Sequence, residues 1–250
     1  MMTISLLTPD RYVRPVYNLA MSSDGQEAVL SELPIFPLAV VLFPGAILPL
    51  HIFEERYKAM IRHAIDNQGQ FGLSFRSDAA VSAETPPAIG SVGCAAKIKA
   101  VLPLEEGRMN ILTAGLLRFH ITEFTQTEPF LIAKVSTFSD DLDLEADVER
   151  LNHDTKEITS QFLKLLQKLN DLSGLANVEL PQSPEALSMV VASALPIDDK
   201  EKQQLLEMTS TKLRLNHLKR HLKEAMTRLE NRVEKHERAK RNGHGKLKEL

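Results

Sequence analysis

The chain has 250 residues, of which 43% are hydrophobic and 25% are charged, and its formal net charge is −3. This composition is typical of a soluble globular protein with one large or two modest domains, and it excludes global disorder and a coiled-coil fibre. The single cysteine, Cys94, excludes an internal disulfide and a thiolate metal cage, so a reducing, cytoplasmic compartment is expected.

Charge and aromatic residues are distributed unevenly along the chain. Residues 212–250 hold 13 Lys+Arg and 5 Asp+Glu, a net charge of +8, which leaves −11 for residues 1–211. Twelve of the 13 Phe+Tyr and 10 of the 13 Pro precede residue 139, which predicts strands and turns there. The predicted parts are an N-terminal extension (1–29), a β-rich domain (30–139), a helical bundle (140–233) and a basic flexible tail (234–250).

The first apolar segment, Leu33–Phe53, has 21 residues without a formal charge, which is long enough to cross a bilayer as a helix. Its prolines exclude such a helix, because each one removes an amide donor and costs about 3 kcal/mol in a helix interior. The prolines are Pro34, Pro37, Pro44 and Pro49. We therefore expect no membrane span, but two short buried strands, Leu38–Phe43 and Ala46–Leu50, joined by a Pro44–Gly45 turn.

An amphipathic helix is predicted over Glu54–Asn67, because apolar residues recur there at intervals of three and four and Gly69 follows. Strand patterns then continue to residue 138, with a hairpin turn at Glu105–Arg108. The expected strands cover 70–75, 89–102, 109–113, 117–122 and 130–138. Together these segments predict a mostly antiparallel, barrel-like sheet of six or seven strands.

The second half of the sequence predicts helices almost throughout. Ser183 caps one of them, and Asp198 or Asp199 caps a shorter one. The expected helices cover 147–172, 184–194, 199–208 and about 210–233. The last helix carries apolar residues at alternating steps of three and four, which is a heptad-like seam. The seam residues are Leu215, Leu218, Leu222, Ala225 and Leu229.

Several short motifs follow one another in a defined order. In the first half they are Leu33–Leu38, Leu42–Gly45, Leu48–Glu54, Arg56–Tyr57, Phe71–Gly72, Ile89–Cys94, Gly107–Leu112 and Gly115–Phe119. In the second half they are Pro184–Leu187, Leu195–Pro196, Lys202–Glu207 and Arg214–Leu229. This series resembles the Lon N-terminal domain family, the substrate-recruiting module of the Lon protease. The resemblance covers about residues 30–235 and implies an α+β fold, a PUA-like antiparallel pseudo-β-barrel followed by an α-helical bundle.

Full Lon proteases continue into an ATPase and a Ser/Lys peptidase, and a chain of 250 residues is expected to hold neither. Gly245–Lys246 is followed by Leu247 instead of Ser or Thr, so it does not form a phosphate loop. His217 and His221 lie among basic residues that repel a metal ion. We therefore expect a stand-alone substrate-binding domain without catalytic activity, cofactor or metal.

The resemblance and the apolar, proline-rich segment predict a module that captures exposed apolar segments of other polypeptides. The candidate binding residues are Phe43, Leu48, His51, Phe53 and Tyr57, with Arg118 as a polar rim. Core packing is the alternative role for most of these residues. Such binding depends on apolar burial, at about 25 cal/mol per Å², and is expected to change little with salt.

Two further functions are considered from the sequence. A PUA-like barrel with a basic tail could bind RNA, but the tail lacks aromatic residues for base stacking and the body carries −11, so nucleic acid is not the favoured partner. An adaptor could dock on a Lon-type protease or form a homodimer through the last helix. The predicted partner surface on that helix comprises Leu215, Leu218, Leu222 and Leu229.

Overall fold

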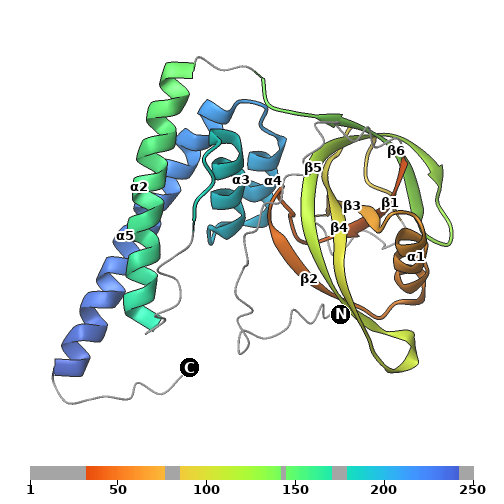
Figure 1. The fold of residues 1–250 in the computed structure, drawn as a ribbon, viewed down its shortest axis with the longest axis horizontal. Helices are drawn as coiled ribbons and strands as arrows, with labels where there is room; N and C mark the ends of the chain where they lie inside the picture. The colour runs from red at the N-terminus through yellow and green to blue at the C-terminus, as the bar shows by residue number, and fades with distance from the viewer. Residues whose placement is uncertain (1–31, 77–84, 142–144, 171–178, 242–250) are drawn as a thin grey trace. The chain divides into compact units, whose positions relative to one another are not determined.

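The computed structural model describes residues 32–76, 85–141, 145–170 and 179–241, and the chain divides into two compact units (Figure 1). The sheet unit comprises the chain up to Asp140 together with Asp198–Thr209. The helical unit comprises Asp141–Ile197 and the chain from Ser210 onward. The bundle predicted over 140–233 therefore differs from the structure, which groups residues 198–209 with the sheet.

Within the described residues, the sheet unit contains six strands, two α-helices and one short 3-10 turn. In chain order they are β1 (Glu32–Leu38), β2 (Ile47–Ile52), α1 (Glu55–Asp66), β3 (Gln70–Phe75), β4 (Val92–Pro103), the 3-10 turn (Glu105–Gly107), β5 (Met109–Gln126), β6 (Leu131–Phe138) and α4 (Asp199–Glu207). The helical unit contains α2 (Glu145–Asn170), α3 (Pro184–Ala194) and α5 (Thr211–Arg241).

The strands form one sheet in the order β2-β5-β4-β3-β1-β6, and β5 also pairs with β6. The long strand β5 pairs with β2 near its start and with β6 near its end, so the sheet closes on itself. The described sheet is mostly antiparallel, as expected, and its parallel pair is β1 with β3. The chain between them passes through β2 and α1, and this long connection returns it in the same direction.

The strand predicted over Leu38–Phe43 is not formed, because β1 ends at Leu38 and residues 39–46 lie outside strands. The residues before the turn are buried all the same, and Phe43 has no exposed surface. An apolar run alone does not distinguish a buried strand from a buried loop. The expected Pro44–Gly45 turn is present, and its glycine has a φ of 79°, which favours a residue without a Cβ.

This turn is held against β5 by backbone hydrogen bonds at Gly115. The Gly45 N–H donates to the Gly115 carbonyl at 3.0 Å, and the Gly115 N–H donates to the Ala46 carbonyl at 2.9 Å. A Cβ on Gly115 would lie 2.1 Å from the carbonyl oxygen of Phe43. The approach of the two backbones therefore requires glycine at position 115.

The interior of the sheet is filled by aliphatic side chains around the ring of Phe119. A Cβ on Gly72 or Gly93 would lie 2.7 Å or 2.5 Å from this ring, so both glycines leave space for it. The buried cluster comprises Leu33, Ile35, Ala95, Phe119, Ile121, Leu131, Ala133 and Val135. These residues come from β1, β4, β5 and β6, so four strands of the closed sheet contribute to this apolar cluster.

The helix termini follow the sequence signals. Ser183 accepts a hydrogen bond from the Ala186 N–H at the start of α3, whose first residue is Pro184. Asp198 accepts one from the Lys200 N–H at 2.8 Å at the start of α4. Both predicted caps are therefore confirmed, and they fix where these helices begin.

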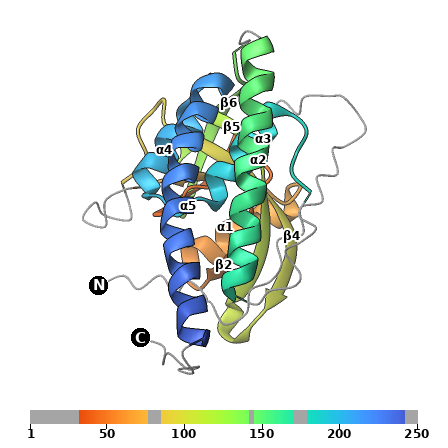
Figure 2. The ribbon, with the colours of Figure 1, turned by 90° about the vertical axis from the view of Figure 1, so that its left-hand side faces the viewer.

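In the helical unit, α2 and α5 run side by side in the same direction, as Figure 2 shows. Lys212 pairs with Asp147 at 2.5 Å, and Lys219 pairs with Asp154. The two lysines are seven residues apart on α5, and the two aspartates are seven residues apart on α2. This spacing is typical of parallel helices in heptad register. The hydrogen bonds from the lysines lower the pKa of both aspartates.

The heptad-like seam of α5 faces its own chain. Leu215, Leu218, Leu222 and Leu229 are all buried, with exposed fractions of 5% or less. Leu215 belongs to one cluster with Val148 and Leu151 of α2. The seam is therefore filled inside the helical unit, which contradicts its predicted role as a free dimerisation surface. The helix also continues to Arg241, so residues 234–241 are helical where a flexible tail was predicted.

Candidate functional site

The predicted binding residues divide into a buried and an accessible set. Phe43 is 0% and Tyr57 is 8% exposed, so both pack in the interior. Leu48 and His51 on β2 are half-buried, and Phe53 just after β2 is 46% exposed. Leu48 and His51 on β2 and Phe53 after it therefore keep more accessible surface than Phe43 and Tyr57.

Arg118 is buried instead of forming a polar rim, with 2% of its surface exposed. Its guanidinium donates to Asp140 Oδ1 at 2.5 Å and to the carbonyl oxygens of Leu206 at 3.1 Å and Met208 at 2.6 Å. It also lies over the ring of Phe138 at 4.4 Å. Strand alternation correctly points this side chain out of the barrel, but α4 and the residues after it cover that side.

An exposed apolar face lies on the outer side of β2, β5 and β4. Direct cross-strand partners point to the same side of a sheet, and His51 lies opposite Asn110, which lies opposite Leu102. The next row holds Pro49, Leu112 and Ala100. We call this surface, together with Phe53, the outer face; its residues are Pro49, His51, Phe53, Ala100, Leu102, Asn110 and Leu112.

The outer face is held in a defined arrangement. His51 Nδ1 lies 2.7 Å from Asn110 Oδ1, and the His51 ring stacks on Phe53 with 5.8 Å between centroids. Leu102 is 60% exposed at the far strand. Sequence patterns identified His51 and Phe53 but missed Leu102, because only the strand register shows that β4 continues the surface that begins on β2.

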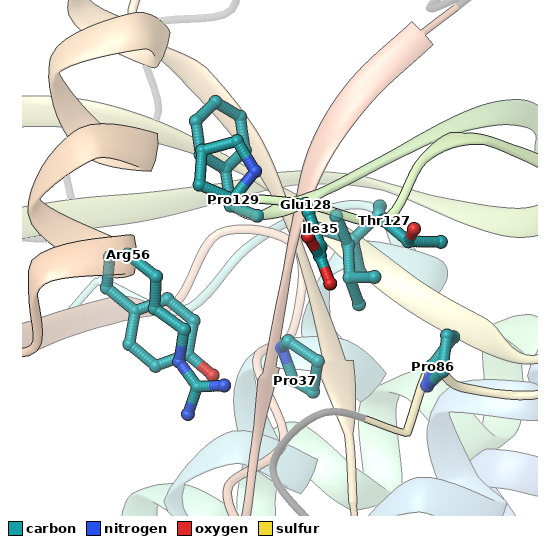
Figure 3. Close-up of a pocket in the computed structure, with 10 residues that line it drawn as sticks. Ile35, Pro37, Arg56, Pro86, Thr127, Glu128 and Pro129 are labelled. Carbon is teal, nitrogen blue, oxygen red and sulfur yellow. The ribbon is translucent and has the colours of Figure 1, made fainter.

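A pocket, which we call the edge pocket, lies between α1, β1 and the turn before β6 (Figure 3). It has a volume of about 440 Å³. Arg56 and Tyr57 come from α1, and Ile35 and Pro37 come from β1. The remaining lining residues are Pro86, Thr127, Glu128, Pro129, Phe130 and Leu131. Of all the residues that line the edge pocket, the sequence analysis selected only Tyr57 as a candidate. The lining residues could not be grouped from the sequence, because they are separated by up to 96 positions in the chain.

The edge pocket forms where β1 loses one of its partner strands. Pairing with β6 ends at Ile35 and Leu131, while pairing with β3 continues to Leu38. The Leu38 carbonyl accepts a hydrogen bond from the Arg76 N–H, so this carbonyl points toward β3. Because the carbonyls of successive strand residues point to opposite edges, the Pro37 carbonyl points toward the open edge of β1. Because proline has no N–H, this edge offers a carbonyl acceptor but no donor.

Charged groups surround the phenol of Tyr57 in the edge pocket. Arg56 lies over the Tyr57 ring at 4.7 Å and donates to Glu54 Oε2 at 2.7 Å. Arg76 hydrogen-bonds to the phenol oxygen. Burial is the largest cause that raises the pKa of Tyr57, and the two arginines oppose it. The hydroxyl is therefore protonated at neutral pH.

Cys94 is fully buried in β4, where burial raises the pKa of its thiol to about 12. We expect the native protein at pH 8 to resist alkylation and to release one reactive thiol only in guanidinium chloride, because the thiolate is the reactive form. A thiol titration with a disulfide reagent in both states measures this. Rapid stoichiometric labelling of the folded protein would contradict the buried, protonated thiol.

Metal binding finds no support in the described ranges, where no three His, Cys, Asp or Glu side chains are grouped closely enough to hold an ion. None of the helices described by the structure combines the length and apolar character needed to cross a membrane. The outer face and the edge pocket are the two surfaces that bring candidate residues together in the described part of the chain.

The fold of this chain is similar to that of solved Lon N-terminal domains. The N-terminal domain of the Mycobacterium avium complex Lon protease aligns with a TM-score of 0.60 and 19% identity, over 77% of this chain and 98% of that chain. The Lon N-terminal domain protein from Xanthomonas campestris aligns with a TM-score of 0.52 and 22% identity, over 75% and 96%. At these identities the likeness establishes the fold.

The family follows from the sequence. The family model of the ATP-dependent protease La (LON) substrate-binding domain matches residues 32–224, and the chain belongs to this family, as its motifs predicted. The Lon protease of Brevibacillus choshinensis is 27% identical over 84% of this chain and 28% of its own length. Lon protease 2 of Herpetosiphon aurantiacus is 29% identical over 76% and 23%. The chain thus spans about a quarter of these relatives.

Proposed function

We propose that this protein is a non-catalytic polypeptide-binding module that captures extended apolar segments on its outer face. The observation that carries the proposal is a rigid three-stranded surface on which large apolar side chains stay accessible. Phe53 and Leu102 are 46% and 60% exposed at its two sides, and His51 is fixed between them by Asn110. Exposed apolar groups gathered on a rigid scaffold are characteristic of interaction sites.

Family membership supports a role in binding substrate polypeptides, since the matched family is a substrate-binding domain. The similarity covers about a quarter of the Lon relatives, and we extend to this chain only the binding role. In this proposal the protein works in the cytoplasm, alone or as an adaptor that presents bound chains to a Lon-type protease. No catalytic group is assigned.

The test is a double substitution on the outer face, Phe53→Ser with Leu102→Ser. We expect at least a tenfold loss of affinity for an unfolded model protein, because burying each large apolar side chain contributes about 1.5–3 kcal/mol. Fluorescence anisotropy with a labelled, permanently unfolded protein measures the affinity.

The matched control is Leu213→Ser, which removes an equally large side chain that is 58% exposed on α5. It should bind as the wild type does. Equal affinity of the double variant and the control would contradict the proposal. A steep loss of binding between 50 and 200 mM salt would instead indicate phosphate contacts and favour the RNA alternative.

A further inference from the structure

Strand β2 has one edge without a partner strand in the described part of the chain. It is the first strand in the sheet order, and among the described strands it pairs with β5 alone. An open edge can accept a further strand, because its N–H and C=O groups have no partners within the sheet. What the edge can bind depends on the groups that it presents and on how it is protected.

The strand register shows which backbone groups point to the open edge. The Gly115 N–H donates to the Ala46 carbonyl at 2.9 Å, so position 46 faces β5. The backbone groups of successive residues alternate between the two edges, and β2 pairs with β5 without a register shift. Ile47, Pro49 and His51 therefore direct their backbone groups to the open edge. Ile47 and His51 each offer a donor and an acceptor there, and Pro49 offers an acceptor.

The open edge borders the outer face. Pro49 and His51 belong to that face, and directly paired residues of neighbouring strands point to the same side of a sheet. Alternate side chains of a strand added to β2 would therefore extend the outer face next to His51. The remaining side chains would lie beside Leu48 and Leu50, which are half-buried. Both sides of an added strand thus meet apolar surface.

The open edge of β2 lacks the protection found at β4. Pairing of β4 with β3 ends at Lys97, and the strand then has a bulge around the exposed Lys99 and ends at Pro103. Lysine, bulges and proline are features by which proteins prevent the addition of strands. Strand β2 has no formally charged residue and no bulge, and Pro49 removes a single donor.

We propose that an extended apolar segment of a partner polypeptide adds to the open edge of β2 as a further strand. Its main chain pairs with Ile47, Pro49 and His51, and its side chains pack beside the outer face and beside Leu48 and Leu50. This rests on the proposed function and specifies the substrate class. The preferred segments are uncharged, match the six residues of β2 in length and keep their backbone N–H groups free.

A second copy of β2 fits this edge less well than a segment without proline. An antiparallel pair of two β2 strands centred on Pro49 would place two prolines opposite each other. That central pair would lose both of its hydrogen bonds, because neither proline has an N–H. A partner segment without proline loses only one of them.

The experiment compares three labelled peptides that share one sequence of leucine and valine residues between serines. One is unmodified, one is N-methylated at every second residue so that one edge keeps its N–H groups, and one is N-methylated at consecutive residues so that both edges lose them. Fluorescence anisotropy with the full chain measures their affinities. The first two should agree within about threefold, and the third should bind at least about tenfold more weakly, because several hydrogen bonds are lost. Equal affinity of all three would overturn strand addition.

Pro49→Val tests the edge from the side of the protein, because it supplies the missing donor and keeps an apolar side chain. Circular dichroism verifies its fold. It should bind the unmodified peptide about two- to tenfold more tightly and leave the affinity for the consecutively methylated peptide unchanged. Pro103→Val, at the exposed end of β4, is the matched control and should change neither affinity. An unchanged affinity of Pro49→Val for the unmodified peptide would contradict pairing at this edge.

The outcomes distinguish strand addition from the proposed function. If all three peptides bound equally while Phe53→Ser with Leu102→Ser lost binding, the proposed function would stand without strand addition. Absence of binding to every peptide and to unfolded protein would remove both. If sedimentation showed a wild-type mass that rises with concentration and falls when the unmodified peptide is added, the edge would belong to a second copy and the proposal would be overturned.

Discussion

Arg118→Met is expected to lower the free energy of unfolding by about 3–5 kcal/mol, the cost of breaking a buried ion pair by removing one partner. The Asp140 side chain is only 6% exposed, and without Arg118 it keeps a charge away from water. The carbonyls of Leu206 and Met208 lose their donor as well. Urea denaturation followed by far-UV circular dichroism measures the change.

Arg108→Met is the matched control. Arg108 directly precedes β5, the strand that carries Arg118, and 40% of its side chain is exposed. Its effect should stay within about 0.5 kcal/mol, as for most surface substitutions. Replacing Asp140 with leucine in the Arg118→Met background should recover part of the loss, since the buried carboxylate is then removed as well. A loss below 1 kcal/mol for Arg118→Met would show that Asp140 and the carbonyls find other partners.

Leu218→Ala should destabilise the protein by about 2–5 kcal/mol, the range for removing a fully buried leucine side chain. Leu218 is 0% exposed in the seam that α5 forms with its own chain. Leu213→Ala, on the same helix with 58% exposure, provides the control and should change stability little. Urea denaturation gives both values.

Sedimentation of the same variants distinguishes an internal seam from a subunit interface. Because the seam is filled within one chain, the folded masses of wild type and Leu218→Ala should agree at every concentration. If the mass of the wild type rose with concentration and the mass of Leu218→Ala did not, the result would contradict the internal packing described for α2 and α5.

Local signals predicted the helices and their caps well. Ser183 and Asp198 are short-range caps, and their partners lie within three residues. The parallel pair β1–β3 could not be predicted in the same way, because it depends on where a long connection returns the chain. The proline-rich run shows the same limit, since Phe43 is buried as expected although its backbone forms no strand.

The candidate site was only partly predictable for a related reason. The sequence suggested Arg118 as a polar rim, but it gave no sign that Met208, 90 residues later, would accept its hydrogen bond. His51 and Phe53 belong to one continuous motif and were found from it. The edge pocket was missed, because Pro37, Pro86 and Pro129 come from three separate segments.

The assignment of α4 to the sheet unit affects the order in which the protein can mature during translation. When β6 has left the ribosome, Arg118 still lacks its two carbonyl partners, and the Val92 carbonyl lacks the hydrogen bond from Gln203. The sheet unit is completed only after Asp198–Thr209 emerges, by which time α2 and α3 are already synthesised. The two units therefore mature in an interleaved order, and a fragment that stops at Asp140 is an unfinished sheet unit.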